Sequence, residues 1–168
     1  MSSKRFPLLL TLAVTLLGLA AAAPVALAAS KSAVIKIATV TLKVNGKTSK
    51  HSALVTSAGK PVYLLTGDSS KSPKCESATC LGNWPAVTSS SSKPVVGSGV
   101  SGKVGVWHHN GINQLTLNGH PLYTFAGDSS ADVANGEDLT SDGGTWEVLA
   151  PSGSAVSASS KSSSGSGW

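Results

Sequence analysis

The chain contains nearly the same phrase twice, and this internal repeat limits the possible folds more than any other feature. "AGKPVYLLTGDSS" occupies residues 58–70, and "NGHPLYTFAGDSS" occupies residues 118–130. An offset of sixty residues aligns several identical residues: Pro61 with Pro121, Tyr63 with Tyr123, and Asp68 with Asp128. One such unit alone would be a marginal hairpin, whereas two copies can bury a shared apolar face. The repeat therefore predicts a duplicated β-unit with one core.

Short runs of Val, Ile, Leu and Thr, divided by Gly, Asn and Ser, dominate the chain after residue 30, without helical periodicity. Asn-Gly pairs at Asn45, Asn110 and Asn118 indicate tight turns, because a type I′ turn needs positive φ at both central residues. The expected strands are residues 33–44 (as one or two strands), 53–56, 62–66, 104–108, 112–117, 120–125 and 145–149. We predict an all-β fold, a small antiparallel domain built from two pseudo-symmetric β-hairpin/meander repeats at about 33–88 and 103–150.

The two ends of the chain differ in composition from this predicted domain, which we place at residues 31–150. Lys4 and Arg5 precede an apolar run over residues 8–23, and a small-x-small site ends at Ala28. This pattern is typical of a signal peptide, so we expect residues 1–28 to be removed and no membrane span to remain. The alternative is an uncleaved anchor, because residues 8–29 could almost span a bilayer. Residues 151–168 are rich in Ser and Gly and are expected to be disordered.

The charge of the chain excludes one class of partner. The mature chain has no Arg, and no basic patch is interleaved with aromatic residues, so nucleic acid binding is not expected. Its charges are uneven: residues 31–100 hold nine Lys and two acidic residues, whereas residues 101–168 hold two Lys and six acidic residues. This distribution fits either two faces that partly neutralise each other or a polar interaction surface.

Cys75 and Cys80 are the two cysteines of the chain. In an exported protein a disulfide is the ordinary state of such a pair, and the spacing is not the C-x-x-C of a reactive dithiol. The loop that contains them, residues 71–87, is expected to have no regular structure of its own. Trp84, followed by Pro85, is expected to pack back on the sheet as an apolar anchor.

The repeated segments resemble a family of bacterial secreted repeats in uncharacterised lipoproteins, which is described by the motif Tyr-x-[Phe/Trp/Tyr]-x-x-Asp. Tyr123, Phe125 and Asp128 fit this motif fully, whereas the first copy has Leu65 in place of the aromatic residue. Members typically carry a Cys pair followed by Trp-Pro-Pro, which corresponds here to Cys75, Cys80, Trp84 and Pro85, with Ala86 instead of the second Pro. The resemblance covers about residues 35–153. It implies export and a two-repeat β-domain, but no particular activity, and this chain lacks the Cys of a lipid-anchored N-terminus.

The motif residues admit an architectural and a functional interpretation. They are Tyr63 and Asp68 with Trp84 in the first repeat, and Tyr123, Phe125 and Asp128 with Trp146 in the second. In the architectural interpretation, each Asp caps its own turn through a backbone N–H two residues on, and each Tyr packs its ring. The Tyr and Asp of one motif are roughly 16 Å apart along an extended strand and cannot touch. We therefore expect any pairing to cross the repeats: Tyr63 with Asp128, and Tyr123 with Asp68.

Signatures of catalysis and of metal binding are weak. The chain has neither G-x-S-x-G nor H-E-x-x-H. Asp68 and Asp128 are a possible glycosidase pair, although their Gly-Asp-Ser context is more typical of turns. His108 and His109 would point to opposite faces of a strand, and we interpret all four histidines, which include His51 and His120, as surface residues. No enzyme activity, cofactor or metal site is expected.

These observations predict an exported protein of the cell envelope, either secreted to the extracellular space or periplasmic. Its expected role is non-enzymatic binding or structure, with an unknown envelope component as partner. The alternative is an exported redox or metal-binding protein of the electron-transfer type, which would use the Tyr, Trp, His and Cys side chains.

Overall fold

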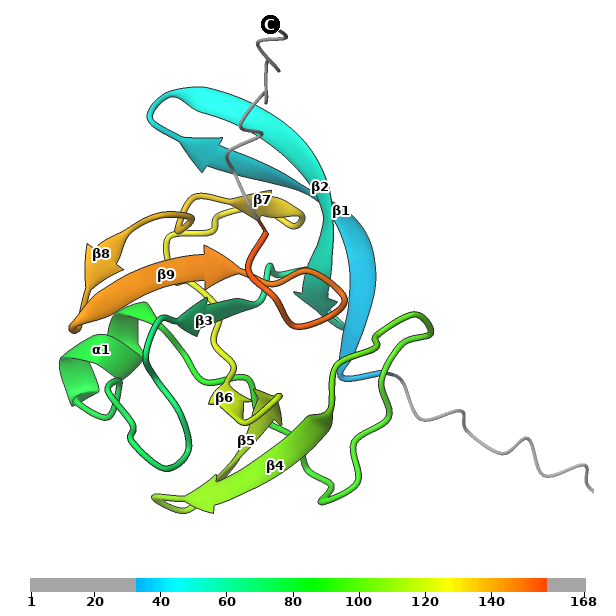
Figure 1. The fold of residues 1–168 in the computed structure, drawn as a ribbon, viewed down its shortest axis with the longest axis vertical. Helices are drawn as coiled ribbons and strands as arrows, with labels where there is room; N and C mark the ends of the chain where they lie inside the picture. Colours follow the sequence, from blue (N-terminus) through cyan, green and yellow to red (C-terminus); the bar gives the residue numbers. More distant parts are fainter. Residues whose placement is uncertain (1–32, 157–168) are drawn as a thin grey trace, which may run out of the picture. The chain divides into compact units, whose positions relative to one another are not determined.

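The fold was analysed in a computed structural model, which describes residues 33–156 (Figure 1). The predicted signal peptide, residues 1–28, and residues 157–168 of the predicted tail lie outside the described residues.

A long hairpin forms the first part of the fold. β1 (Ile35–Val44) and β2 (Lys47–Thr56) pair in antiparallel register over their whole lengths. Asn45 and Gly46 connect them with φ angles of 50° and 74°, as a type I′ turn requires. β2 begins six residues before the predicted start at Ala53, because the polar segment from Lys47 pairs with the end of β1 although it has no apolar alternation.

The strands of residues 33–156 form three small sheets, and the predicted all-β class is confirmed. The first sheet has the order β2-β1-β7, in which β7 (Val133–Ala134) runs parallel to β1. The second has the order β3-β9-β8, formed by β3 (Tyr63–Leu65), β9 (Gly144–Val148) and β8 (Thr140–Ser141). The third has the order β4-β5-β6, formed by β4 (Val104–His109), β5 (Ile112–Leu117) and β6 (His120–Pro121). This last sheet is the predicted meander, but its third strand ends at Pro121 instead of residue 125, because Tyr123 pairs with Tyr63 and Ala86 outside this sheet.

One short helix, α1 (Ala78–Asn83), lies where the sequence predicted a loop without regular structure. The hydroxyl of Ser77 caps its first turn by accepting a hydrogen bond from the backbone N–H of Cys80. The helix is too short to leave a periodic apolar pattern, so sequence periodicity could not reveal it.

The two repeats are interlocked through two equivalent rings of backbone hydrogen bonds. In the first ring, Val62 N–H donates to Leu54, Leu54 N–H to Leu149, and Leu149 N–H to Val62. The second ring has the same cyclic order at the equivalent positions: Leu122 N–H donates to Leu115, Leu115 N–H to Val87, and Val87 N–H to Leu122. Each ring takes two members from one repeat and the third from the other. Neither repeat can therefore complete its own backbone hydrogen bonding alone.

The apolar side chains form two clusters, and the β1–β2 hairpin contributes to both. One cluster contains the six ring residues together with Ile35 and Leu117. The other contains the motif aromatics with Val40, Leu42 and Val55. The hairpin therefore ties the ring region to the motif region.

The described chain continues past the predicted domain end at residue 150. The backbone N–H of Ala150 donates to Ser154, and the N–H of Val156 donates to Val148 on β9. Val156 is buried against the motif cluster. The predicted boundary was therefore too early, because a single Val in a Ser/Gly-rich segment carries no detectable pattern.

Candidate functional site

The two motif tyrosines lie side by side in the core. Tyr63 and Tyr123 form an antiparallel bridge, in which the N–H of Tyr63 donates to the carbonyl of Tyr123 at 2.9 Å and the reverse bond is 3.0 Å. Both side chains are fully buried. The two repeats therefore meet at equivalent residues, as a pseudo-two-fold arrangement requires.

Each tyrosine hydroxyl donates to the aspartate of the other repeat. Tyr63 Oη lies 2.8 Å from Asp128 Oδ2, and Tyr123 Oη lies 2.8 Å from Asp68 Oδ2. The predicted pairing across the repeats is confirmed at both positions. Asp68 and Asp128 are 1% and 3% exposed, so the two hydrogen bonds are shielded from solvent.

The second oxygen of each carboxylate holds a backbone N–H of the following loop. Asp68 Oδ1 accepts from Lys74 N–H at 2.9 Å, and Asp128 Oδ1 accepts from Asn135 N–H at 2.7 Å. The expectation that each Asp caps its own turn through the residue two positions on is wrong. The Asp residue instead fixes a loop six or seven residues further along, because its side chain points inward rather than along the turn.

Burial raises the pKa of both tyrosines well above the ordinary value, and the facing carboxylates add to this effect. Burial also raises the pKa of Asp128, although its hydrogen bonds to Asn135 and Tyr63 oppose the shift. Tyr63 and Tyr123 therefore keep their protons at physiological pH and act as hydrogen-bond donors. This arrangement does not supply a phenolate nucleophile or a phenolate base.

The motif tryptophans stack on each other between the tyrosines. The rings of Trp84 and Trp146 are 3.9 Å apart and inclined by 7°. Tyr63 contacts Trp84 edge-on at 5.3 Å, and Tyr123 contacts Trp146 edge-on at 5.2 Å. Such stacked and edge-on pairs stabilise a core by roughly 0.5–1.5 kcal/mol each beyond the burial of apolar area.

The third position of the motif, which holds Leu65 in the first repeat and Phe125 in the second, is packed differently in the two repeats. Phe125 stacks on Trp84 with a centroid distance of 4.3 Å and is only partly buried. Leu65, at the equivalent position, is fully buried and pairs with Trp146 across β3 and β9. A Cβ placed at Gly144 would lie 2.7 Å from Leu65 Cδ1, which indicates that this site is already filled.

Cys75 and Cys80 form the predicted disulfide, and both are buried. The bond closes the turn that leads into α1, and Trp84 follows as the C-terminal cap of this helix. The disulfide thus helps to position Trp84 against the aromatic cluster.

Sequence reasoning missed Glu137, a buried carboxyl beside this cluster. Its Oε2 accepts from the N–H of Val148 at 2.7 Å, and burial raises its pKa to about 7. The adjacent Gly136 N–H lies 3.3 Å from Tyr63 Oη. Glu137 lies in an acidic loop with other Asp residues, and no sequence pattern distinguished it from an exposed acidic residue such as Asp138.

The four histidines have separate hydrogen-bond partners, namely Ser49 for His51, Asn113 for His108, Gln114 for His109, and the carbonyl of Asp68 for His120. His108 is exposed, as expected for a surface residue, whereas His51, His109 and His120 are partly buried. The ring of His109 also stacks on Trp107 with a centroid distance of 3.5 Å. Within residues 33–156, no group of three His, Cys, Asp or Glu side chains is close enough to hold a metal ion.

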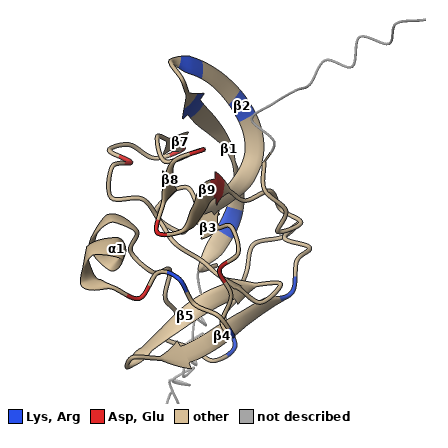
Figure 2. Cartoon of the chain, turned by 60° about the vertical axis from the view of Figure 1, so that its left-hand side comes forward, with Lys and Arg blue, Asp and Glu red and all other residues tan. Residues whose placement is uncertain are grey.

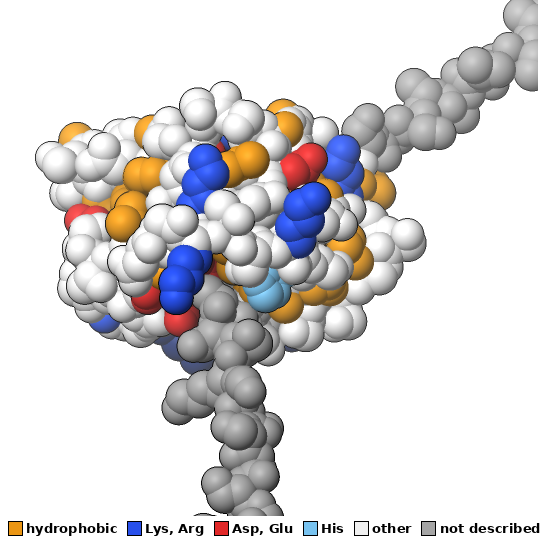
Figure 3. Space-filling model, turned by 90° about the horizontal axis from the view of Figure 1, so that it is seen from above, with side chains coloured by type: hydrophobic (Ala, Val, Ile, Leu, Met, Phe, Trp, Pro, Cys, Tyr) orange, Lys and Arg blue, Asp and Glu red, His pale blue; other side chains and the backbone are white. Residues whose placement is uncertain are grey.

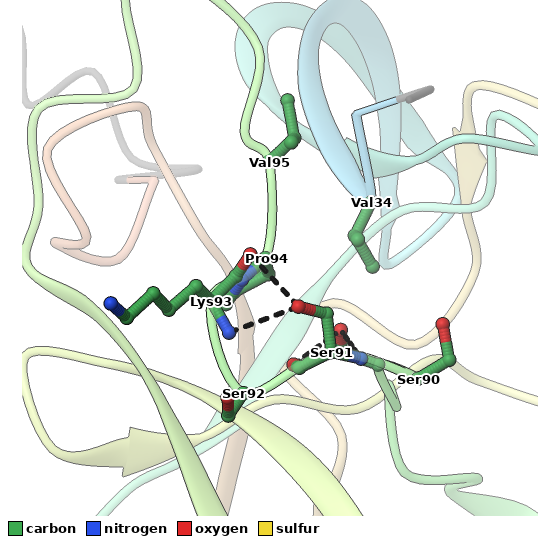
Figure 4. Close-up of a pocket in the computed structure, with 8 residues that line it drawn as sticks. Val34, Ser90, Ser91, Ser92, Lys93, Pro94 and Val95 are labelled. Carbon is green, nitrogen blue, oxygen red and sulfur yellow. Dashed lines mark hydrogen bonds between the residues drawn. The ribbon is translucent and has the colours of Figure 1, made fainter. Parts of the chain in front are cut away.

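A polar groove of about 630 Å³ lies between Val34 and the serine-rich segment 89–95 (Figure 4). The hydroxyls of Ser89 and Ser91 are engaged within the loop, because they donate to the carbonyls of Ser91 and Lys93. Figure 4 shows the Lys93 side chain extending away from Ser90 and Ser91. Among the described residues, its lining consists of Val34 and residues 89–95, of which Lys93 is the charged one.

The shared core and the crossed Tyr–Asp pairs define an all-β protein made of two interlocked repeats. Residues 106–150, within the second of these, match a family model described as a secreted repeat of unknown function. The matched residues include Tyr123, Phe125, Asp128 and Trp146, and the family suggested by the motif is confirmed. The match agrees with export. The chain matches no curated protein and no solved structure. None of the helices in residues 33–156 has the length and apolar character needed to cross a membrane.

Proposed function

We propose that the protein is a non-enzymatic binding or structural domain of the bacterial cell envelope. The observation that carries this proposal is the crossed pairing of Tyr63 with Asp128 and of Tyr123 with Asp68. Each hydroxyl and one oxygen of each carboxylate join the two repeats, and the other carboxylate oxygen holds a loop of its own repeat. Groups that act on a substrate need to reach it within hydrogen-bond distance. The motif therefore serves to hold the fold together.

The glycosidase alternative is disfavoured by the same contacts. Two catalytic carboxyl groups would have to face a sugar from opposite sides of an open cleft. Asp68 and Asp128 are instead almost fully buried, and both oxygens of each are occupied by protein donors. This burial supports the non-enzymatic role.

The envelope location is supported by two further observations. The matched family consists of secreted repeats, and the Cys75–Cys80 disulfide is a bond that persists in oxidising compartments outside the cytoplasm. Because the motif is buried, a partner would be contacted by exposed elements such as the β1–β2 hairpin.

Co-sedimentation with isolated cell envelopes tests the proposal. Purified residues 31–168 are mixed with envelopes of the producing bacterium and centrifuged, with envelope-free samples as the control. We expect the protein to pellet with the envelopes in saturable amounts. Protein that stays in the supernatant at both low and physiological salt would contradict the binding role.

The aromatic cluster favours one second candidate, a one-electron redox protein. Trp84 and Trp146 stack at 3.9 Å, each contacts one tyrosine, and a carboxylate lies 2.8 Å from each phenol. A photogenerated ruthenium(III) oxidant could take one electron from Tyr63, whose proton would pass to Asp128 to leave a neutral tyrosyl radical and a carboxylic acid. Transient absorption tests this candidate: Asp128→Asn should slow tyrosyl formation, and equal rates in both proteins would exclude the pathway.

A further inference from the structure

We propose that the outward face of the β1–β2 hairpin binds a linear phosphate-bearing polymer of the cell envelope. This inference rests on the binding role proposed above and names the ligand class. The face consists of Thr39, Thr41, Lys43, Thr48, Lys50 and Ser52, and we call it the lysine face.

The strand register brings the two lysines of this face together. Thr41 lies opposite Lys50, and Lys43 lies opposite Thr48. Directly opposed residues share a face of an antiparallel pair, and Lys50 is two residues from Thr48, the partner of Lys43. Lys43 and Lys50 are therefore diagonal neighbours, with their Cα atoms roughly 7–8 Å apart. Except for Thr41, which is partly covered, every residue of the face is exposed. The opposite face of β1 buries Val40 and Leu42 in the core, which fixes the direction of the lysine face.

The charge of the hairpin has one sign. Residues 31–67 contain six Lys and no acidic residue. Figure 2 shows the blue Lys positions on β1 and β2, with no red Asp or Glu position on either strand. In the view from above, several Lys side chains stand out from the surface of the molecule, and some have an acidic side chain beside them (Figure 3). Asp132 is the acidic neighbour at one border, where its carbonyl accepts from Thr41 N–H. The face therefore has a positive potential that attracts anions.

Edge protection is the competing explanation for lysines on a hairpin. Lys residues on an edge strand prevent pairing with a second chain, and β2 is an edge strand of its sheet. That explanation accounts for Lys50, and it can apply to Lys43 as well, because β7 pairs with β1 only at Thr41 and Leu42 and ends before Lys43. The two explanations differ in what they predict for polyphosphate binding. Edge protection leaves the affinity unchanged when Lys43 and Lys50 are replaced, whereas a ligand on this face makes the affinity fall.

The chemistry of the face fits phosphate groups along a flexible chain. Lysine ammonium groups act as point charges that tolerate varied geometry, and the neighbouring hydroxyls can donate to phosphate oxygens. The exposed large apolar residues, Val95 and Leu139, lie outside the hairpin. Insertion into a bilayer and docking of a protein both commonly use exposed apolar anchors. The face is therefore better suited to a hydrophilic polyanion than to a membrane or a protein partner.

Isothermal titration calorimetry of residues 31–168 with long-chain inorganic polyphosphate tests the inference. The double variant Lys43→Gln/Lys50→Gln should weaken binding roughly tenfold or more and lower the salt dependence of affinity. The matched control is Lys93→Gln/Lys103→Gln, which removes two exposed lysines elsewhere and should change affinity by less than about twofold. Lys43→Gln is also measured alone, because it leaves Lys50 on the edge strand β2 unchanged.

Four results would overturn the inference. They are the absence of polyphosphate binding, an equal loss in the control variant, equally tight binding of poly-glutamate, and binding only to vesicles that contain phosphatidylglycerol. Envelope co-sedimentation separates this inference from the proposed function. If the double variant still pellets like the wild type, the lysine face is not the binding surface, whereas the binding role stands.

Discussion

The hydroxyl of Tyr63 donates a 2.8 Å hydrogen bond to Asp128, a residue 65 positions further along the chain and in the other repeat. The equivalent bond joins Tyr123 to Asp68. The motif shared by the two repeats is therefore satisfied only when both are folded together. This exchange explains physically why a Tyr and an Asp recur at a spacing that prevents contact within one copy.

Replacement of either tyrosine by Phe should destabilise the fold without changing its core volume. Tyr63→Phe removes the donor to a buried carboxylate and the acceptor for Gly136 N–H. We expect a loss of about 1–3 kcal/mol in the free energy of unfolding, measured by urea denaturation. An unchanged midpoint would show that the hydrogen bond contributes nothing.

The two motifs should respond differently to exchange of their third residue. Leu65→Phe places a larger ring in a filled site and should cost about 1–3 kcal/mol. Phe125→Leu removes a stacking contact with Trp84 at a partly open position and should cost about 1 kcal/mol. Thermal unfolding of both variants checks this order, and a larger loss for Phe125→Leu would contradict it.

Glu137 should make the protein less stable as the pH rises. Its pKa is about 7 in the folded protein against 4.5 without the fold, so its stabilising effect is complete below pH 4.5 and is lost as the pH rises through 7. Glu137→Gln retains an acceptor for Val148 N–H and should be more stable than the wild type at pH 8 by about 2 kcal/mol, after allowance for solvent screening. At pH 4 the two should agree within a few tenths of a kcal/mol, because Glu137 is then mostly protonated in both the folded and the unfolded state.

Urea midpoints of the Glu137→Gln variant and the wild type between pH 4 and 8 provide the measurement. Burial also raises the pKa values of Asp128 and Glu147, so part of the decline should persist in the variant. Parallel pH profiles for the two proteins would exclude Glu137 as a source of the dependence.

Removal of the disulfide should have a modest effect. The loop between Cys75 and Cys80 is short, so the chain-entropy model gives a loss of about 2 kcal/mol for the variant with Ala at both positions. Fluorescence of Trp84 should also change, because the disulfide lies next to the helix that positions it. Equal stability with and without a reducing agent would contradict this prediction.

Much of this arrangement could be predicted from local sequence patterns. The Asn-Gly pairs at Asn45, Asn110 and Asn118 specify turns through positive φ, and all three occur as expected. The sixty-residue offset predicted which Tyr pairs with which Asp. The Tyr and Asp of one motif are too far apart along the strand to touch, so each Tyr can pair only with the Asp of the other repeat.

The loops of the motif could not be predicted in the same way. Lys74 and Asn135 bind the carboxylates through their backbone N–H groups, which every residue but Pro possesses, so their side chains give no signal. The parallel pairing of β7 with β1 involves only two residues on each strand and follows from tertiary packing. Short elements held by distant contacts leave no periodic pattern to detect.

A double-mutant cycle on unfolding free energy tests the exchange between repeats most directly. The cycle Tyr63→Phe with Asp128→Asn should show a coupling of about 1 kcal/mol or more, because each residue is the partner of the other. The cycle Tyr63→Phe with Asp68→Asn, within one repeat, serves as the control and should be additive within about 0.5 kcal/mol. Strong coupling within a repeat and additivity between repeats would contradict the account.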